Sequence, residues 1–331
     1  MELTTVWFGL IAVLWAGYFL LEGFDFGVGM LLPVLARGDR QRRLLINTIG
    51  PVWDGNEVWL LVAGGATFAA FPEWYATLFS GFYLPLLIIV VALIVRGLAF
   101  EYRGKVDSPQ WRRRWDACII GGSLVPALLW GVAFGNILRG VKLDARHEYV
   151  GSFFDLLNPY ALLGGLTTLT LFALHGAVFL ALKTDGDVRF RAGRLASRLV
   201  VPAIAVAGGF LLWTQLAHGD AWSWTLSIVA AAALIGAALA IWRRREGWAF
   251  AATAVTIVLA TAALFVALFP NVLPSTIADA NSLTVTNASS TPYTLKIMTW
   301  VAVVFTPIVL GYQSWTYWVF RKRLRVENIP T

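Results

Sequence analysis

Five charged side chains stand out in this chain because they lie within apolar segments, where a charge is energetically costly. Glu22 and Asp25 are three positions apart, which places both carboxylates on one face of a helix. Asp54 and Glu57 repeat this spacing in the next apolar segment, and Arg96 lies in a third. Carboxylates with a counter-charge inside a membrane form proton relays, ion sites or structural ion pairs.

The depth of these acids predicts one shared polar site. Asp54 lies eleven residues after Arg43, and Asp25 twelve residues before Arg37. Both acids would then sit about 16–18 Å along a helix from a basic loop. We therefore expect them to meet in the cytoplasmic half of the membrane, with Arg96 as the counter-charge for Asp25 or Asp54. We interpret this set as functional rather than as a purely structural salt-bridge network.

Other polar residues support or fall outside this site. Glu101 follows Arg96 near the expected interface, where the mouth of a path would lie. Trp53 is adjacent to Asp54 and would anchor or gate the site, although packing is the more frequent role of such a residue. Asp116 is expected at a helix start, where capping is a sufficient role. His175, alone on an apolar segment, is expected to be a hydrogen-bonded core residue rather than a haem ligand.

The composition identifies the elements that carry these residues as membrane helices. The 331 residues are 58% apolar and 14% charged, whereas soluble domains average about 45–50% and about 25%. This composition excludes disordered, collagen-like, coiled-coil and disulfide-scaffold proteins. The single cysteine excludes a disulfide within the chain and a cysteine-based metal cage, and no metal site is expected.

Nine apolar runs are long enough to be membrane-spanning helices, which predicts an all-α polytopic membrane protein. They lie at about 6–35, 52–71, 77–100, 115–138, 159–182, 199–217, 224–242, 249–269 and 297–320. We expect a single integral membrane domain over 1–331. Its first four-helix group, over 6–138, carries the polar cluster, and 159–320 contains the remaining five helices. Residues 270–295 are expected to form an irregular surface loop.

The basic residues predict the orientation. Of the 26 lysines and arginines, 21 lie in one alternating set of loops, four lie in the opposite set, and Arg96 lies in a helix. The positive-inside rule then places the N-terminus outside and the C-terminus in the cytoplasm. The net charge of +7 is explained by this topology and does not indicate nucleic acid as a partner.

Two function classes are compatible with these residues alone. The acids could form a proton wire that feeds a redox or transport reaction, or an ion site in a secondary transporter. A transporter should show matched broken helices in its two halves. The only clear interruption is the Gly/Pro break near residue 50.

Several stretches resemble subunit II of the cytochrome bd family of quinol oxidases. They are Gly23–Gly29 (GFDFGVG), Pro51–Leu60 (PVWDGNEVWL), Gly64–Pro72 (GGATFAAFP), Gly131–Asn136 (GVAFGN), Leu156–Pro159 (LLNP) and Met298–Val304 (MTWVAVV). The Trp-Asp-Gly-Asn block is highly specific, and the similarity extends over essentially the whole chain.

This resemblance implies a terminal oxidase in the bacterial cytoplasmic membrane that reduces oxygen to water with electrons from quinol. Haem b, haem d and the quinol-oxidation site would belong to a partner, subunit I. The chain would be its structural twin, with two four-helix groups and a peripheral helix. A small single-helix accessory subunit and a structural quinone or lipid are further possibilities of this family.

The resemblance also implies roles for individual residues. Asp25 and Asp54 would carry protons from the cytoplasm, together with Glu22, Glu57 and Glu101. Glu22 and Glu101 stand where aspartate is common in relatives. Charge balance and haem-site support would come from a second set, which comprises Arg96, Trp53 and Asn56. The runner-up hypothesis is that the cluster mainly holds the heterodimer and the haem pocket together.

Overall fold

The computed structural model describes residues 2–329, and most of these residues are helical. The membrane-length helices are α1 (Leu3–Leu35), α3 (Trp53–Ala70), α5 (Tyr83–Tyr102), α6 (Pro109–Arg139), α7 (Pro159–Lys183), α8 (Asp187–His218), α9 (Ala221–Trp242), α10 (Glu246–Leu268) and α11 (Pro292–Val319). Two shorter helices, α2 (Asp39–Ile49) and α4 (Pro72–Gly81), lie between them.

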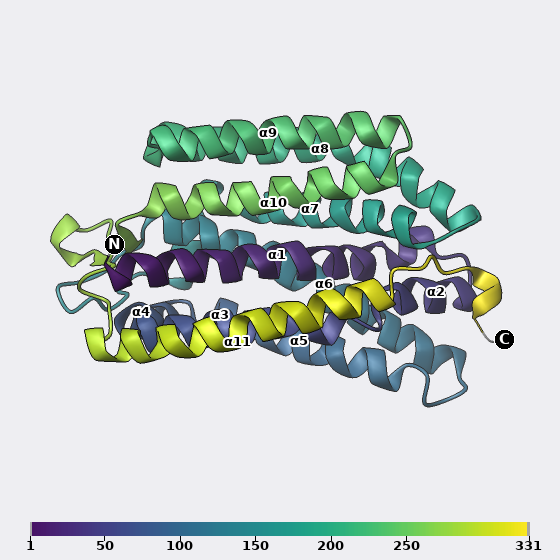
Figure 1. The fold of residues 1–331 in the computed structure, drawn as a ribbon, viewed down its shortest axis with the longest axis horizontal. Helices are drawn as coiled ribbons and strands as arrows, with labels where there is room; N and C mark the ends of the chain where they lie inside the picture. The colour runs from purple at the N-terminus through teal and green to yellow at the C-terminus, as the bar shows by residue number, and fades with distance from the viewer. Residues whose placement is uncertain (1, 330–331) are drawn as a thin grey trace.

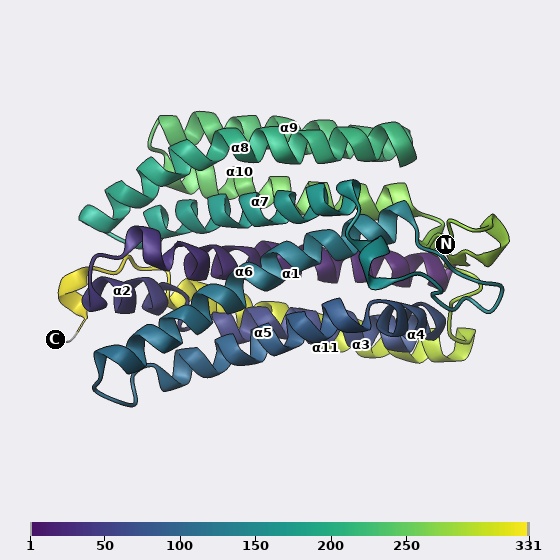
Figure 2. The ribbon, with the colours of Figure 1, turned by 180° about the vertical axis from the view of Figure 1, so that it is seen from behind.

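The helices run roughly parallel to one long axis (Figure 1). Helices α1, α3, α5 and α6 form one group, and α7 to α10 form the second. Helix α1 is central and packs against α3, α6, α7 and α10. Helix α11 is peripheral and packs only lightly against α1 and α3. The view from behind shows α6 crossing α1 on the side away from α11 (Figure 2). The predicted architecture of two four-helix groups and a peripheral helix is confirmed.

Eight helices in residues 2–329 are long and apolar enough to span a membrane. The ninth predicted span, 52–71, corresponds to helix α3. This helix is not one of the eight, and its 18 residues include the polar side chains of Asp54, Asn56 and Glu57, which lower its hydropathy. The count of nine spans therefore stays a prediction. The segment predicted at 77–100 is wrong at its start, because α4 ends at Gly81 and α5 begins at Tyr83.

The sequence explains where several helices begin. Helices α6, α7 and α11 each start with proline, whose missing N–H is not needed in the first turn. The preceding residue caps each of them: Ser108, Asn158 and Thr291 accept hydrogen bonds from backbone N–H groups of the first turn. The structural start of α6 at Pro109 places Asp116 in its third turn, so the predicted capping role of Asp116 is wrong.

Glycine lets α1 and α7 approach each other at backbone distance. A Cβ atom on Gly27 would lie 2.2 Å from the carbonyl oxygen of Phe172 and 2.6 Å from the Cα of Gly176. Gly29 faces Ser123 of α6 with equally little space. The small-residue spacing around Asp25 therefore serves close helix packing, which fixes the depth and rotation of α1.

The two ends of the bundle are built differently. At the end that holds the N-terminus, 270–291 is more ordered than the irregular loop we predicted, with strands β1 (Asn271–Leu273) and β2 (Leu283–Thr284) paired antiparallel. At the opposite end, the C-terminal segment 320–329 folds back over α7. There Lys183 donates to the carbonyl of Phe320, and Arg323 Nη1 donates to the carbonyl of Thr184 at 3.1 Å.

We expect Gly27→Ala to destabilise the protein by about 1–3 kcal/mol or more, because the added methyl meets backbone atoms that have no room to move. Gly9→Ala on the same helix is the matched control, since a Cβ there meets nothing within 4 Å. Thermal unfolding of the purified complex measures the difference. Equal melting temperatures for the two variants would contradict the close α1–α7 packing.

Candidate functional site

Arg96 is the centre of a buried ionic cluster formed by three helices of the first group. Its side chain is fully buried, and it forms an ion pair with the equally buried Glu22 of α1. A second carboxylate, Glu57 of α3, lies 3.4 Å away and is 20% exposed. The guanidinium also lies over the ring of Phe26, 4.6 Å from its centroid. One positive charge therefore joins α1, α3 and α5.

Asp25 joins this cluster through an amide rather than through the arginine. Its Oδ2 accepts a hydrogen bond from Nδ2 of Asn56 at 2.7 Å, and both residues are buried. Within residues 2–329, Arg96 forms its ion pairs with Glu22 and Glu57 and none with Asp25 or Asp54, so its role as the counter-charge of Asp25 or Asp54 stays a prediction.

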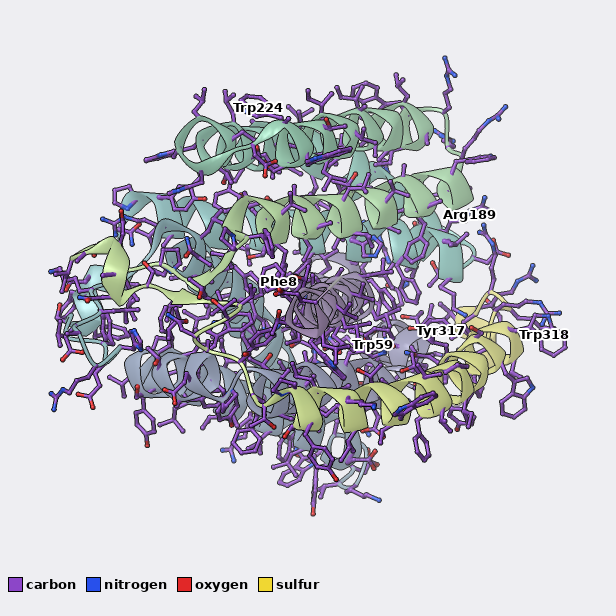
Figure 3. The ribbon with its side chains drawn as sticks, turned by 60° about the vertical axis from the view of Figure 1, so that its left-hand side comes forward. Phe8, Trp59, Arg189, Trp224, Tyr317 and Trp318 are labelled. Atoms are coloured by element: carbon purple, nitrogen blue, oxygen red, sulfur yellow. The ribbon has the colours of Figure 1, made fainter. Side chains whose placement is uncertain are left out.

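Helix α11 contributes two residues that sequence reasoning missed. Tyr317 Oη donates to Oδ1 of Asn56 at 2.6 Å, and Gln313 Nε2 lies 3.4 Å from the same oxygen. Trp59 Nε1 in turn donates to Oε1 of Gln313 at 2.9 Å. Figure 3 shows Trp59 and Tyr317 between α11 and the rest of the bundle, whereas Trp318 points away. Gln313 and Tyr317 are four residues apart and share one helix face, which is the signal that was available.

Three predicted site residues lie outside this buried cluster. Asp54 and Glu101 are exposed on α3 and α5. Trp53 is half-buried and packs against Phe100, with ring centroids 4.9 Å apart. Residues 43–54 are not one helix, because α2 ends at Ile49 and a turn precedes α3. Asp54 lies two residues before Asn56, which contacts Asp25, but its side chain is exposed.

The buried cluster contains polar atoms that no protein group satisfies. They are Oε2 of Glu22, Oδ1 of Asp25, and Nε and Nη1 of Arg96. Buried polar atoms normally have a hydrogen-bond partner, and an unpaired one marks a place where water or another molecule is expected to bind.

A second ionic network closes the end of the same helix group. Asp116 accepts from Arg103 Nε at 2.6 Å and from Arg42 Nη1 at 2.9 Å, and Arg103 also binds Asp39 at 2.5 Å. These contacts tie α2, α5 and α6 together beside the loops that carry most of the basic residues.

His175 is a buried core residue of α7. It uses Nδ1 for a 2.8 Å hydrogen bond with Thr253, and its ring stacks on Phe250 at a centroid distance of 4.7 Å. The best-formed cavity lies among α6 to α10, has a volume of about 110 Å³, and is lined by apolar and threonine side chains. No histidine, cysteine or methionine lines it. Within residues 2–329 no group of three or more histidine, cysteine or acidic side chains is placed to hold a metal ion.

Comparison with known proteins identifies the family. Residues 3–320 match the family described as cytochrome bd terminal oxidase subunit II. The chain belongs to this family. It is 43% identical to the cytochrome bd ubiquinol oxidase subunit 2 of Bacillus subtilis, over 98% of this chain and 97% of the relative. It is 37% identical to the cytochrome bd-I ubiquinol oxidase subunit 2 of Escherichia coli K12, over 98% and 96%.

The fold agrees with a solved structure. The bd oxidase from Geobacillus thermodenitrificans superposes with a TM-score of 0.80, at 18% identity, over 97% of this chain and 99% of that chain. The chain is therefore a multi-pass bacterial plasma-membrane subunit of a quinol oxidase complex that contains haem and a subunit I. This membership favours the oxidase prediction over the secondary-transporter alternative.

We expect Arg96→Met to destabilise the complex by about 3–5 kcal/mol, because it leaves the buried Glu22 without a positive partner. Arg112→Met is the control: Arg112 is 30% exposed, and its partners Asp107 and Asp39 are 94% and 37% exposed, so its loss should cost less than about 1 kcal/mol. Thermal unfolding of the purified complex measures both. Adding Glu22→Gln to Arg96→Met should recover part of the loss, and a loss that Glu22→Gln leaves unchanged would contradict the pairing.

Proposed function

We propose that this chain supplies a cytoplasmic-side proton path, and structural support, to a subunit I that binds haem b and haem d. Subunit I would oxidise the quinol and reduce oxygen to water. The observation that supports the path is the buried cluster around Arg96, in which Glu22 and Asp25 each retain a carboxylate oxygen without a protein partner. A carboxylate that relays protons needs such a free oxygen, because its other oxygen is held in a hydrogen bond.

The arrangement of the acids suggests the direction of the path. Glu101 and Asp54 are exposed near the ends of α5 and α3 that adjoin the basic loops. Glu57 lies one turn deeper than Asp54 and is part-exposed, while Glu22 and Asp25 are fully buried. Protons would enter past Glu101 and Asp54, pass Glu57 and reach Glu22 and Asp25. Arg96 would balance the charge of the carboxylates, and Asn56 and Trp53 would hold the surrounding helices in place.

The face formed by α3, α5 and α11 is the proposed contact with subunit I. Helix α11 is almost unburied along its length, with Leu295 its one buried residue in the described part of the chain. Leu61 of α3 is 72% exposed and Trp300 of α11 is 65% exposed. Glu57 is part-exposed and belongs to α3, one of these three helices. A partner bound to this face would therefore lie next to the buried cluster around Arg96.

The apolar cavity is the proposed place for a structural quinone or lipid tail. Phe19, Phe172 and Leu264 are among its lining residues, and its only polar atoms come from threonines that also bond their own helices. Such a lining suits a hydrocarbon chain. A small single-helix accessory subunit is a further proposal carried by the family resemblance alone.

We expect Asp25→Asn to lower oxygen consumption by about 10²-fold, because the amide cannot carry the proton and general acid–base groups contribute effects of this size. The visible haem absorbance of the purified complex should be unchanged. Asp107→Asn, in the exposed loop between α5 and α6, is the control and should keep full turnover. Glu22→Gln should resemble Asp25→Asn.

Two outcomes would contradict this proposal. Full turnover in both Asp25→Asn and Glu22→Gln would show that the cluster carries no protons. Loss of haem absorbance in these variants before any loss of proton uptake would favour the alternative role, in which the cluster mainly holds the heterodimer and haem pocket together.

For the cavity, we expect Ala260→Phe to reduce the quinone or lipid that co-purifies with the complex, because Ala260 lines the cavity and a phenyl ring would fill it. Ala251→Phe on the exposed face of the same helix is the control. Extraction followed by mass spectrometry measures the bound molecules. Equal content in both variants would place the molecule elsewhere.

A further inference from the structure

A chain of hydrogen bonds enters the buried cluster from α11 and ends on Asp25. Trp59 donates to Gln313, Gln313 lies against Asn56, and Asn56 donates to Asp25. Tyr317 adds a second, shorter bond to the same oxygen of Asn56. Two of the links are carboxamides, and a carboxamide has an acceptor end and a donor end. The direction of the chain therefore depends on which way each amide is turned.

The indole of Trp59 determines that direction, because its N–H donates and cannot accept. Gln313 must present its oxygen to Trp59 and its NH2 group to Asn56. Asn56 must then present its oxygen to Gln313 and its NH2 group to Asp25. The assignment of both amides follows from the network alone. Every donor in the chain points toward Asp25.

Tyr317 does not set the direction. A phenol hydroxyl donates or accepts equally well, so it would bond Asn56 in either amide orientation. Its 2.6 Å hydrogen bond to Asn56 strengthens the contact between α11 and α3, but it does not determine which way the Asn56 amide is turned. The residues that select it are Trp59 and Gln313.

We infer that Trp59 and Gln313 are positioning residues that lock the Asn56 amide, so that Asp25 carries its proton on Oδ1 alone. Oδ2 already accepts the NH2 group of Asn56, whereas Oδ1 is buried and has no protein partner. This inference rests on the proposed role of Asp25 as a proton carrier.

The lock has a chemical purpose. If Asn56 were free to turn, the protonated Oδ2 of Asp25 would donate to the amide oxygen, and an O–H donor makes a shorter bond than an N–H donor. The proton would then be held against α3 instead of on the oxygen that faces away from Asn56. A locked amide keeps the proton on the side where it can be exchanged.

The test uses the purified complex and infrared difference spectroscopy of the carboxylic C=O stretch, with the Asp25 band assigned by its loss in Asp25→Asn. In the native protein the C=O oxygen is Oδ2, which accepts a hydrogen bond. Trp59→Phe and Gln313→Met release the amide, so the C=O oxygen becomes the unbonded Oδ1 and the band should move to higher frequency. Tyr317→Phe should leave the band in place.

Turnover gives the second readout. Trp59→Phe and Gln313→Met should lower oxygen consumption by about tenfold, the equivalent of one hydrogen bond to a charged group, with haem absorbance intact. Trp222→Phe, at the exposed start of α9 in the second helix group, should change neither turnover nor the band. Trp59 packs on Gly17 of α1, so a loss of turnover in Trp59→Phe alone could be explained by disturbed packing. Gln313→Met interrupts the same chain of hydrogen bonds and leaves Trp59 in place, and it therefore serves as the second variant.

The results separate this inference from the proposed function. An Asp25 band that stays in place in both Trp59→Phe and Gln313→Met would overturn the lock, as would the absence of any Asp25 band in the native complex. If the band moves but Asp25→Asn retains full turnover, the lock holds and the proton path through Asp25 fails.

Discussion

The structure of the first helix group depends on the burial of one guanidinium. Arg96 has no exposed surface, so the energetic cost of its charge has to be offset by carboxylates delivered from neighbouring helices. Glu22 and Glu57 are those carboxylates, and their contact with Arg96 fixes α1 and α3 relative to α5. Gly122 makes room on the remaining side, because a Cβ there would lie 2.7 Å from that of Arg96. The rotations of α1, α3, α5 and α6 about their own axes are thus determined by their contacts with the Arg96 side chain.

Much of this organisation could be predicted from the sequence, because each apolar run long enough to cross a membrane contains a helix. The ends were harder where a short apolar helix adjoins a long one, since α4 and α5 are separated only at Phe82 and hydropathy does not mark this break. Glu22, Glu57 and Arg96 were correctly placed in one region, because buried charges require partners. The individual contacts, namely the ion pairs of Arg96 with Glu22 and Glu57, could not be predicted, because they depend on how α1, α3 and α5 are rotated against one another. Gln313 and Tyr317 were missed because a neutral polar residue in a membrane helix, unlike a charged one, does not require a partner of opposite charge.

Helix α11 shows how a lightly packed element can still be placed accurately. Near its start, Trp7 Nε1 donates to the carbonyl of Leu295 at 3.2 Å, and beyond its end Arg323 binds both Thr184 and Glu246. Between these two anchors the outer face is apolar and exposed, while the inner face carries Gln313 and Tyr317. The helix is therefore held by polar contacts at its ends and middle rather than by a hydrophobic interface.

This arrangement has a consequence for the order in which the protein is made. The acids of α1 and α3 and the arginine of α5 are synthesised early, and their ion pairs require only the first hundred residues. The amide that faces Asp25 gains its fixed orientation only when α11, among the last segments to leave the ribosome, is inserted and tied down. A chain that stops before α11 would contain every charged residue of the buried cluster, together with Trp59 and Asn56, but it would lack Gln313, through which Trp59 orients the Asn56 amide.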